Sequence, residues 1–258
     1  MLTNLKIAFG RLALSLIVML APSAVAPARA DYIVAPDVVV FCEPTLQHAV
    51  ADLGALWRRE TGIPVRVFIS PTWAELEQVS HRARSDLIIG EGDALASQAI
   101  DRHIVKPETL HRLWRNQLVM ARSADGPTDL AGIAGKAPIA IVDPATAVAG
   151  SEGKKALQAL GLWDTVSAKS VGVVDTADAA YLLANGKVQL ALVYATDVAA
   201  NPGFTVADTL PAASYGPIVY WIAETQNSLS PNAQKFADYL AQPQAQERLR
   251  RDGLEVLP

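Results

Sequence analysis

The stretch VVVFCEPTLQHAV, residues 38–50, decides the fold. Its first five residues, Val38–Cys42, are apolar throughout, which predicts a strand buried on both faces of a sheet. The apolar residues after Pro44 return at intervals of three and four, which predicts an amphipathic helix. These positions share one helical face: Leu46, Val50, Leu53 and Trp57. A buried strand that leads directly into such a helix is typical of an α/β protein.

The same alternation continues toward the C-terminus. Further strands are predicted over Val65–Ser70 and Asp86–Gly90, and helices around Trp73–Val79 and Ala94–Ile100. Strands that alternate with helices favour a mostly parallel sheet with helices on both faces.

A second α/β unit begins at Gln117–Arg122, QLVMAR. Its expected strands are Pro138–Val142, Ser170–Val174 and Gln189–Tyr194, and its expected helices are Thr128–Ile133, Ser151–Leu160 and Thr176–Asn185. A strand over Tyr215–Glu224 and two helices, Pro231–Ala241 and Gln244–Arg251, follow. No flexible linker separates the units, so we expect two lobes with a cleft between them. Lobe I comprises residues 31–116 and 218–258, and lobe II residues 117–217.

The first thirty residues have the pattern of a secretory signal peptide. Lys6 and Arg11 precede the apolar run Leu12–Val25, and Ala28-Arg29-Ala30 supplies small residues at the −3 and −1 positions. The run is short for a membrane span. We therefore expect cleavage after Ala30 and a soluble mature protein in the periplasm.

Charge and cysteine content narrow the function further. Cleavage would leave 228 of the 258 residues, with 19 of the 22 basic residues against 26 acidic ones, and a net charge of −7. This balance argues against nucleic acid as a partner, because a nucleic-acid surface requires a basic patch. The single cysteine, Cys42, cannot form an internal disulfide.

The motifs of catalysis and cofactor binding are absent from the sequence. No histidine is expected at a strand end where it could activate Cys42, and there is no G-x-S-x-G elbow. Phosphate loops and standard metal motifs are also missing, which predicts no enzyme, no cofactor and no dedicated metal site. Cys42 is expected to pack as a small apolar residue. Convergence of Cys42, Glu43 and Glu91 at strand ends would still suit a transition metal.

Several predicted strands are followed by a hydroxyl residue and the start of a helix. These places are Thr45, Thr72, the turn Ala149-Gly150-Ser151, and Asp175-Thr176. Helix N-termini offer unpaired N–H groups and the positive end of a dipole, so they suit anions. Serine and threonine are also ordinary helix caps, and only the set as a whole favours anion binding.

Four stretches of the sequence resemble one known family. They are VDPATAVAGSEGKKALQALGLWDT (residues 142–165), LALVYATDV (190–198), SDLIIGEGD (85–93) and FADYLAQPQAQERLRRDGL (236–254). Together they resemble the periplasmic molybdate- and tungstate-binding proteins of ABC transporters, within the type II solute-binding proteins. The resemblance covers the whole mature chain and implies a two-lobed periplasmic-binding-protein fold.

The resemblance also implies a site and partners. The family holds a tetrahedral oxyanion with hydroxyl and backbone N–H groups and no cationic side chain. Its ligand-binding positions fall on Thr45, Thr72, Ala149, Thr176 and Tyr194. A small inorganic oxyanion would be the ligand, a membrane permease the partner, and a monomer the working form, with no catalytic residue.

This chain departs from the family pattern at three places near the expected site. Cys42-Glu43-Pro44 replaces a small neutral turn, Ser70-Pro71-Thr72 replaces a serine-rich loop, and Glu91 adds an acid after the third strand. A carboxylate about 4 Å from an anion costs about 4 kcal/mol at an effective dielectric constant near 20. The alternative is therefore a related carrier or periplasmic sensor for a metal ion, a metalloid or a small organic acid, with Cys42 and Glu43 modifying the ligand site.

Overall fold

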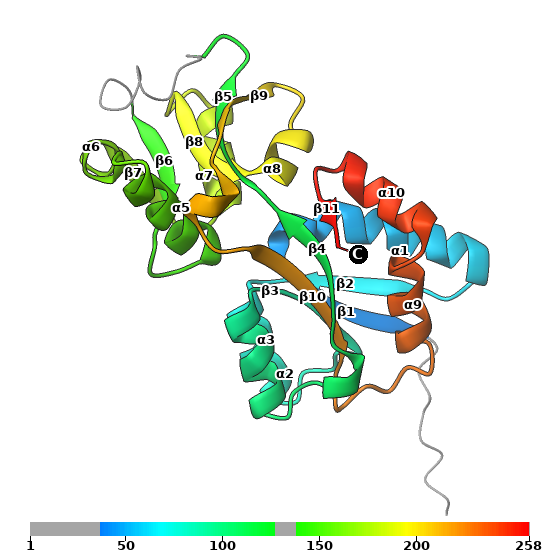
Figure 1. Ribbon diagram of the computed structural model, residues 1–258. Helices are drawn as coiled ribbons and strands as arrows, with labels where there is room; N and C mark the ends of the chain where they lie inside the picture. The colour runs from blue at the N-terminus through cyan, green and yellow to red at the C-terminus, as the bar shows by residue number, and fades with distance from the viewer. Residues whose placement is uncertain (1–36, 127–137, 258) are drawn as a thin grey trace, which may run out of the picture. The chain divides into compact units, whose positions relative to one another are not determined.

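The chain folds around two β-sheets with helices on their faces, in a computed structural model that describes residues 37–126 and 138–257 (Figure 1). Within these ranges the first sheet contains β1 (Val38–Cys42), β2 (Val65–Ile69), β3 (Leu87–Glu91), β4 (His111–Asn116), β10 (Ile218–Glu224) and β11 (Glu255–Val256). Its strand order is β11-β4-β10-β3-β1-β2. The late strand β10 thus lies beside β3, so the C-terminal part of the chain completes the sheet that the N-terminal part begins.

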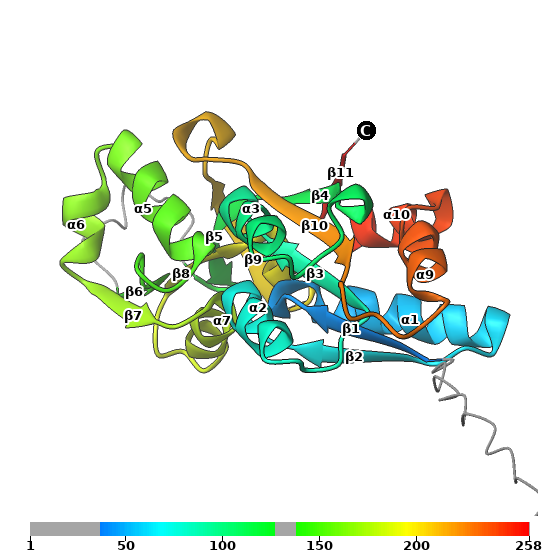
Figure 2. The same cartoon turned by 90° about the horizontal axis from the view of Figure 1, so that it is seen from below.

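Helices cover both faces of the first sheet (Figures 1 and 2). On one face lie α1 (Gln47–Thr61), α9 (Ala233–Leu240) and α10 (Pro243–Arg251), and on the other α2 (Thr72–Ser80) and α3 (Asp93–Asp101). Strand β1 lacks polar residues because both of its faces are buried. Val40 and Cys42 pack in the core under α1 and α9, whereas Phe41 packs in the core under α2 and α3.

The end of α1 follows from local sequence. Gly62 is the C-cap in the left-handed region, with φ 75°, and its N–H donates to the carbonyl of Arg58. A glycine in this conformation ends a helix without steric strain. Pro64 then leads into β2, as the sequence predicted.

The second sheet contains β5 (Leu118–Ser123), β6 (Ile139–Val142), β7 (Ser170–Val173), β8 (Leu190–Tyr194) and β9 (Phe204–Thr209) in the described residues. Its order is β7-β6-β8-β5-β9. The helices of this half are α5 (Val148–Ala159), α6 (Trp163–Ser167), α7 (Thr176–Ala184) and α8 (Ala195–Ala199). Ala179 and Leu183 of α7 pack on one face of the sheet, and Ala156 and Leu157 of α5 belong to the core on the other.

Two connections join the sheets. Gln117 is the single residue between β4 of the first sheet and β5 of the second. The return runs from the end of β9 at Thr209 to the start of β10 at Ile218. By their contacts the described residues all belong to one compact unit.

A buried carboxylate fixes the start of the first sheet. The side chain of Asp86 is fully buried, and its Oδ2 atom accepts a hydrogen bond from the Val39 amide at 2.8 Å. Its Oδ1 atom accepts from the amides of Leu229 at 2.8 Å and Ser230 at 3.0 Å. Asp86 therefore links β1 to the segment that precedes α9.

The sequence-based assignment was correct for the fold class, and the structure corrects several details. Both sheets are mixed, because β10 pairs antiparallel with β3 and β4 in the first sheet, and β5 pairs antiparallel with β8 and β9 in the second. Helix α5 begins at Val148 rather than Ser151, and β10 begins at Ile218 rather than Tyr215. The strands β4, β9 and β11 and the helices α6 and α8 were not predicted. The predicted helix Thr128–Ile133 lies outside the described residues, as does the predicted signal peptide.

Among the described helices, none combines the length and the apolar character that a membrane crossing requires.

Candidate functional site

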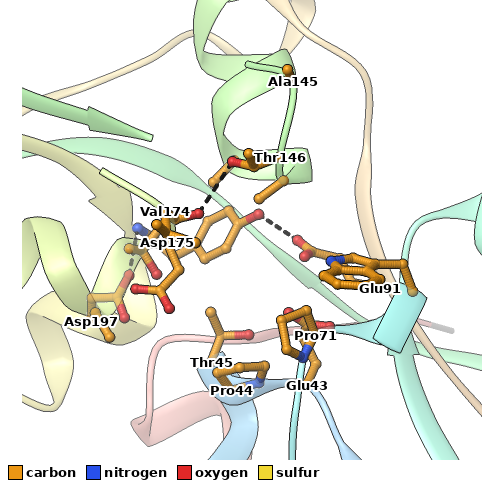
Figure 3. Close-up of a pocket in the computed structure, with 16 residues that line it drawn as sticks. Glu43, Pro44, Thr45, Pro71, Glu91, Ala145, Thr146, Val174, Asp175 and Asp197 are labelled. Carbon is orange, nitrogen blue, oxygen red and sulfur yellow. Dashed lines mark hydrogen bonds between the residues drawn. The ribbon is translucent and has the colours of Figure 1, made fainter. Parts of the chain in front are cut away.

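A cavity of about 400 Å³ lies where strand ends of the two sheets meet (Figure 3). The first sheet contributes the turn after β1, the start of α2 and the end of β3. The second contributes the loops after β6 and β7 and the end of β8. The lining residues are Glu43, Pro44, Thr45, Pro71, Trp73, Glu91, Ala145, Thr146, Ala147, Ala149, Val174, Asp175, Thr176, Ala177, Tyr194 and Asp197.

The structure brings the sequence-predicted site residues together. Thr45, Ala149, Thr176 and Tyr194 all line this cavity. Thr72 lines an adjoining cavity of about 260 Å³, which shares Glu43 and Glu91 with the first. These five positions are separated by up to 149 residues of sequence, and only the fold places them around one space.

Two helices of the second sheet begin at the cavity. No side chain caps the N-terminus of α5, where Ala149 lies, and its N-cap residue is Ala147. At the start of α7, the Asp175 carboxylate accepts a hydrogen bond from the Asp178 amide at 2.8 Å. The amides of the first turns of both helices thus lie at the cavity wall, where they favour negative charge.

Glu43 caps the helix that Thr72 begins. The Oε2 atom of Glu43 accepts hydrogen bonds from the Thr72 amide at 2.7 Å and the Thr72 hydroxyl at 2.5 Å. The same hydroxyl oxygen accepts from the Glu91 amide at 2.8 Å. A carboxylate of the protein itself therefore occupies the anion position at the N-terminus of α2, and Thr72 links the two glutamates.

Close packing holds this link in place. Gly90 precedes Glu91 in β3, and a Cβ atom at Gly90 would lie 2.4 Å from the Trp221 ring and 2.7 Å from the Thr72 methyl group. Only a glycine permits this approach, so the position of Thr72 depends on the absence of a side chain at Gly90.

Tyr194 and Glu91 connect the two lobes across the cavity. The hydroxyl of Tyr194, at the end of β8, donates a hydrogen bond to the Glu91 Oε1 atom, and Glu91 points into the cavity from the end of β3 (Figure 3). Both side chains are buried, with 1% and 5% of their surface exposed. The single hydrogen of the phenol is thereby directed to a carboxyl group of the protein.

Asp197 makes a similar contact within the second lobe. Its carboxyl group accepts from the Tyr194 amide at 2.9 Å and is also hydrogen-bonded by the Thr176 side chain. Three of the predicted hydroxyl residues, Thr72, Thr176 and Tyr194, thus bind carboxyl groups in this structure.

Thr45 is the exception among the predicted hydroxyl residues. Its Oγ1 atom lies 2.9 Å from the Tyr220 hydroxyl, which in turn accepts a hydrogen bond from the Asn116 amide group at 3.1 Å. If Tyr220 donates to Thr45, the hydrogen of Thr45 remains available for the cavity. Asn116 also donates to Thr196 of α8 at 2.9 Å, so it connects both lobes beside Gln117.

Sequence reasoning did not assign Asn116, Tyr220 or Asp197 to the site, and it named Asp175 only as part of a helix start. Asp175 directly follows the predicted strand Ser170–Val174, and Asp197 lies three residues after the predicted strand Gln189–Tyr194. Asn116 and Tyr220 gave no signal, because β4 was not recognised and Tyr220 lies inside an apolar strand.

Burial sets the protonation of the acids. It raises the pKa of Glu43 to about 7, although the hydrogen bonds from Thr72 oppose this, and it raises the pKa of Asp197 to about 6. Burial, with the nearby charge of Glu43, raises the pKa of Glu91 well above its usual value. Burial and the charge of Glu91 raise the pKa of Tyr194, which keeps this phenol protonated.

The cavity wall is acidic and apolar. Among the described residues that line it, none is Lys, Arg or His, whereas Glu43, Glu91, Asp175 and Asp197 all belong to the wall. The remaining surface is largely alanine, proline and Trp73. Positive potential in this cavity therefore comes from helix N-termini and not from cationic side chains.

Cys42 lies beside the cavity without lining it. Its side chain is fully buried in the core under α1, and its thiol lies 3.5 Å from the carbonyl of Glu43. Burial, followed by the charges of Glu75 and Glu43, raises the pKa of the thiol well above its usual value. A buried, protonated thiol is a poor nucleophile and metal ligand. Across the described residues no group of three or more His, Cys, Asp or Glu side chains is arranged to hold a metal ion.

The two sheets and the cavity at their strand ends define the class of the fold, which is the two-lobed type II periplasmic-binding-protein fold. The chain belongs to the bacterial extracellular solute-binding protein family, whose sequence model matches residues 38–255.

Proteins with similar sequences are also solute-binding proteins by name. The molybdate-binding protein ModA of Escherichia coli K12 is 28% identical over 228 residues, which cover 85% of this chain and 89% of that protein. A putative ABC transporter substrate-binding lipoprotein, YvgL of Bacillus subtilis, is 26% identical over 181 residues, which cover 69% of this chain and 70% of that protein. These names describe binding proteins and not enzymes.

Solved structures share the fold. The periplasmic molybdate-binding protein of Azotobacter vinelandii superposes with a TM-score of 0.75 at 21% identity, over 86% of this chain and all of that one. The substrate-binding domain of a putative molybdenum ABC transporter from Clostridium difficile gives a TM-score of 0.73 at 20% identity, over 86% of this chain and 99% of that one. At these identities the likeness establishes the architecture alone.

Proposed function

We propose that this protein is the extracytoplasmic solute-binding component of an ABC transporter and that it carries a small tetrahedral oxyanion, such as molybdate or tungstate. In this proposal the signal peptide is cleaved after Ala30, and the mature monomer delivers its ligand to a membrane permease from the periplasm. No bond of the ligand is broken, and no cofactor takes part.

One observation carries the proposal. The uncapped N-terminus of α5 and the N-terminus of α7 border the same cavity as Thr45 and Tyr194. Helix N-termini bind anions through free N–H groups without a cationic side chain. The names of the molybdate-binding relatives support an oxyanion as the ligand.

The fold supplies a way to enclose the anion. We assign lobe I to residues 31–116 and 218–258 and lobe II to residues 117–217. The first connection between the sheets has only Gln117 outside a strand, so a rotation of the lobes concentrates there and in the segment after β9. Hinge closure of this kind excludes water from the ligand. Ala149 and Thr176 would then donate backbone N–H groups, and Thr45 would offer its hydroxyl group. Thr72 and Tyr194 would offer theirs only after leaving Glu43 and Glu91, to which they donate in this structure.

A second candidate rests on the acids of the cavity wall. Glu43, Glu91, Asp175 and Asp197 would attract a metal ion or an organic cation, and Trp73, with 55% of its surface exposed, offers an aromatic face for a cation. The alternative expected from the sequence, a carrier or periplasmic sensor, included a metal ion as ligand but not an organic cation. Because the thiol of Cys42 faces the core, direct coordination by Cys42 would require a rearrangement of β1.

A thermal-shift titration separates the two candidates. Ligand at a hundred times its dissociation constant stabilises a protein by about 2.7 kcal/mol, which raises the melting temperature by about 5–10 °C for a chain of this size. We expect this shift with molybdate, tungstate or another tetrahedral oxyanion. A shift with zinc, copper or an organic amine, together with none for any oxyanion, would replace the first candidate by the second.

A matched pair of variants tests the site. Thr45→Ala removes a hydroxyl that lines the cavity beside Tyr220, and Thr61→Ala removes one that donates within α1 to the Trp57 carbonyl at 2.8 Å. Thr45→Ala should weaken oxyanion binding by about 1–3 kcal/mol, as for a lost buried hydrogen bond. Thr61→Ala should leave the affinity unchanged, and equal affinities in both variants would remove Thr45 from the site.

A further inference from the structure

We propose that the cleft binds its oxyanion together with a proton, held between the ligand and the carboxyl pair Glu43 and Glu91, and that it therefore prefers oxyanions that retain a hydrogen over fully ionised ones. This inference rests on the proposed function, since it specifies the ligand of the same site. Phosphate and arsenate belong to the preferred class near neutral pH. Sulfate, molybdate and tungstate are fully ionised there and belong to the other class, so each of them would bind only with the uptake of a proton.

The hydrogens of two expected donors are already committed. Thr72 donates its hydroxyl hydrogen to Glu43, and Tyr194 donates its phenol hydrogen to Glu91. Each hydroxyl carries only one hydrogen. Neither side chain can donate to an anion while it keeps its carboxyl partner.

The carboxyl groups themselves then face the ligand. Glu43 and Glu91 both line the cavity, and both are linked through Thr72, whose hydroxyl oxygen accepts from the Glu91 amide. An ionised carboxylate accepts hydrogen bonds only, and so does a fully ionised oxyanion. Two such groups in contact have no hydrogen between them and repel each other.

A single proton reverses this interaction. Whether it sits on the carboxyl group or on the oxyanion, it forms a charge-assisted O–H···O⁻ hydrogen bond, which is among the shorter and stronger kinds in proteins. The complex with one added proton is therefore attractive where the fully ionised complex is repulsive.

Within residues 37–126 and 138–257, no other group near the pair neutralises it. The titratable groups that face Glu43 and Glu91 are Cys42, Glu75, Asp175, Tyr194, Asp197 and Tyr220, and each of them is neutral or negative. Glu75 is fully buried in α2, and neither of its carboxyl oxygens has a hydrogen-bond partner in the structure. Burial also raises the pKa of Glu43 to about 7, so protons are available at neutral pH.

Isothermal titration calorimetry with sulfate and phosphate tests the proposal. The two anions share shape and size, but sulfate stays fully ionised between pH 5.5 and 8.5. We expect the affinity for sulfate to fall about tenfold for each pH unit above 7, the dependence that one bound proton produces. Titrations in two buffers of different ionisation enthalpy should show uptake of about one proton per sulfate at pH 8, and phosphate should bind at least tenfold more tightly than sulfate there.

Glutamine variants identify the carboxyl groups that cause the pH dependence of sulfate binding. In Glu43→Gln and Glu91→Gln the amide oxygen still accepts from Thr72 or Tyr194, while the amide nitrogen becomes a permanent donor to the ligand. Each variant should bind sulfate at least tenfold more tightly than the wild type at pH 8.5, and Glu43→Gln should remove most of the pH dependence. Glu77→Gln, which alters an exposed acid of α2 paired with Arg102, is the matched control and should retain the wild-type dependence.

The outcomes separate this inference from the proposed function. Sulfate affinity that is independent of pH, without proton uptake, would overturn the proton requirement and leave the oxyanion carrier intact. Absence of binding by any oxyanion between pH 5.5 and 8.5 would overturn the carrier itself. Unchanged sulfate affinity in both glutamine variants would show that the carboxyl pair does not face the ligand.

Discussion

Lowering the pH from 8 to 5 should stabilise the unliganded protein, because its cleft contains buried acids. The pKa of Glu43 is raised from 4.5 to about 7 in the folded protein. A raised pKa means that the folded state binds the proton more tightly, so stability is present below pH 4.5 and is lost as the pH rises through 7. For these two pKa values, the linkage relation gives a loss of about 2.5 kcal/mol between pH 5 and pH 8.

Neighbouring acids also stabilise the folded protein at low pH. Burial raises the pKa of Asp197 to about 6 and the pKa values of Glu75 and Glu91 well above their usual range. The carboxyl group of Asp37 acts in the opposite direction, since hydrogen bonds from Arg84 and Arg66 lower its pKa despite some desolvation.

Thermal unfolding followed by circular dichroism measures the effect. A loss of 2.5 kcal/mol corresponds to a fall of about 5–10 °C in melting temperature for a chain of this size. Glu43→Gln removes the titrating group and should flatten the dependence by that amount, whereas Glu77→Gln should not. A melting temperature that rises from pH 5 to pH 8, or equal slopes for wild type and Glu43→Gln, would refute this account of the buried acids.

Four further changes test the packing and the site. Asp86→Ala leaves two buried backbone amides and a partly buried one without their acceptor and should lower the free energy of unfolding by about 3–5 kcal/mol in urea denaturation. Gly90→Ala forces a methyl group against Trp221 and Thr72 and should destabilise the fold by about 1–3 kcal/mol and weaken ligand binding, while Gly172→Ala, which meets open space, should do neither. Tyr194→Phe should weaken oxyanion binding by about 1–3 kcal/mol in calorimetry if the phenol leaves Glu91 for the anion, and unchanged affinity would mean that it does not donate to the ligand. Cys42→Val should alter stability and leave affinity unchanged; a loss of binding would restore Cys42 as a ligand group.

The periodicity of the sequence was sufficient for much of the fold. Val38–Cys42 had to be a buried strand because it offers no polar face, and Gly62 had to end the following helix because it adopts a left-handed conformation at little cost. The strands β4 and β9 were not predicted because their exposed residues interrupt the apolar pattern. Their pairing with distant strands, and not local preference, keeps them extended.

The candidate site, too, could be predicted from the sequence only in part. The sequence by itself determined which hydroxyl residues and helix starts follow the strands, because these features are local and repeat along the chain. Only the tertiary structure decided that Glu43 caps the helix of Thr72 and that Glu91 meets the phenol of Tyr194 from the other lobe. Burial and neighbouring charge, which fix the protonation of these acids, arise from atoms far apart in sequence, and no local pattern encodes them.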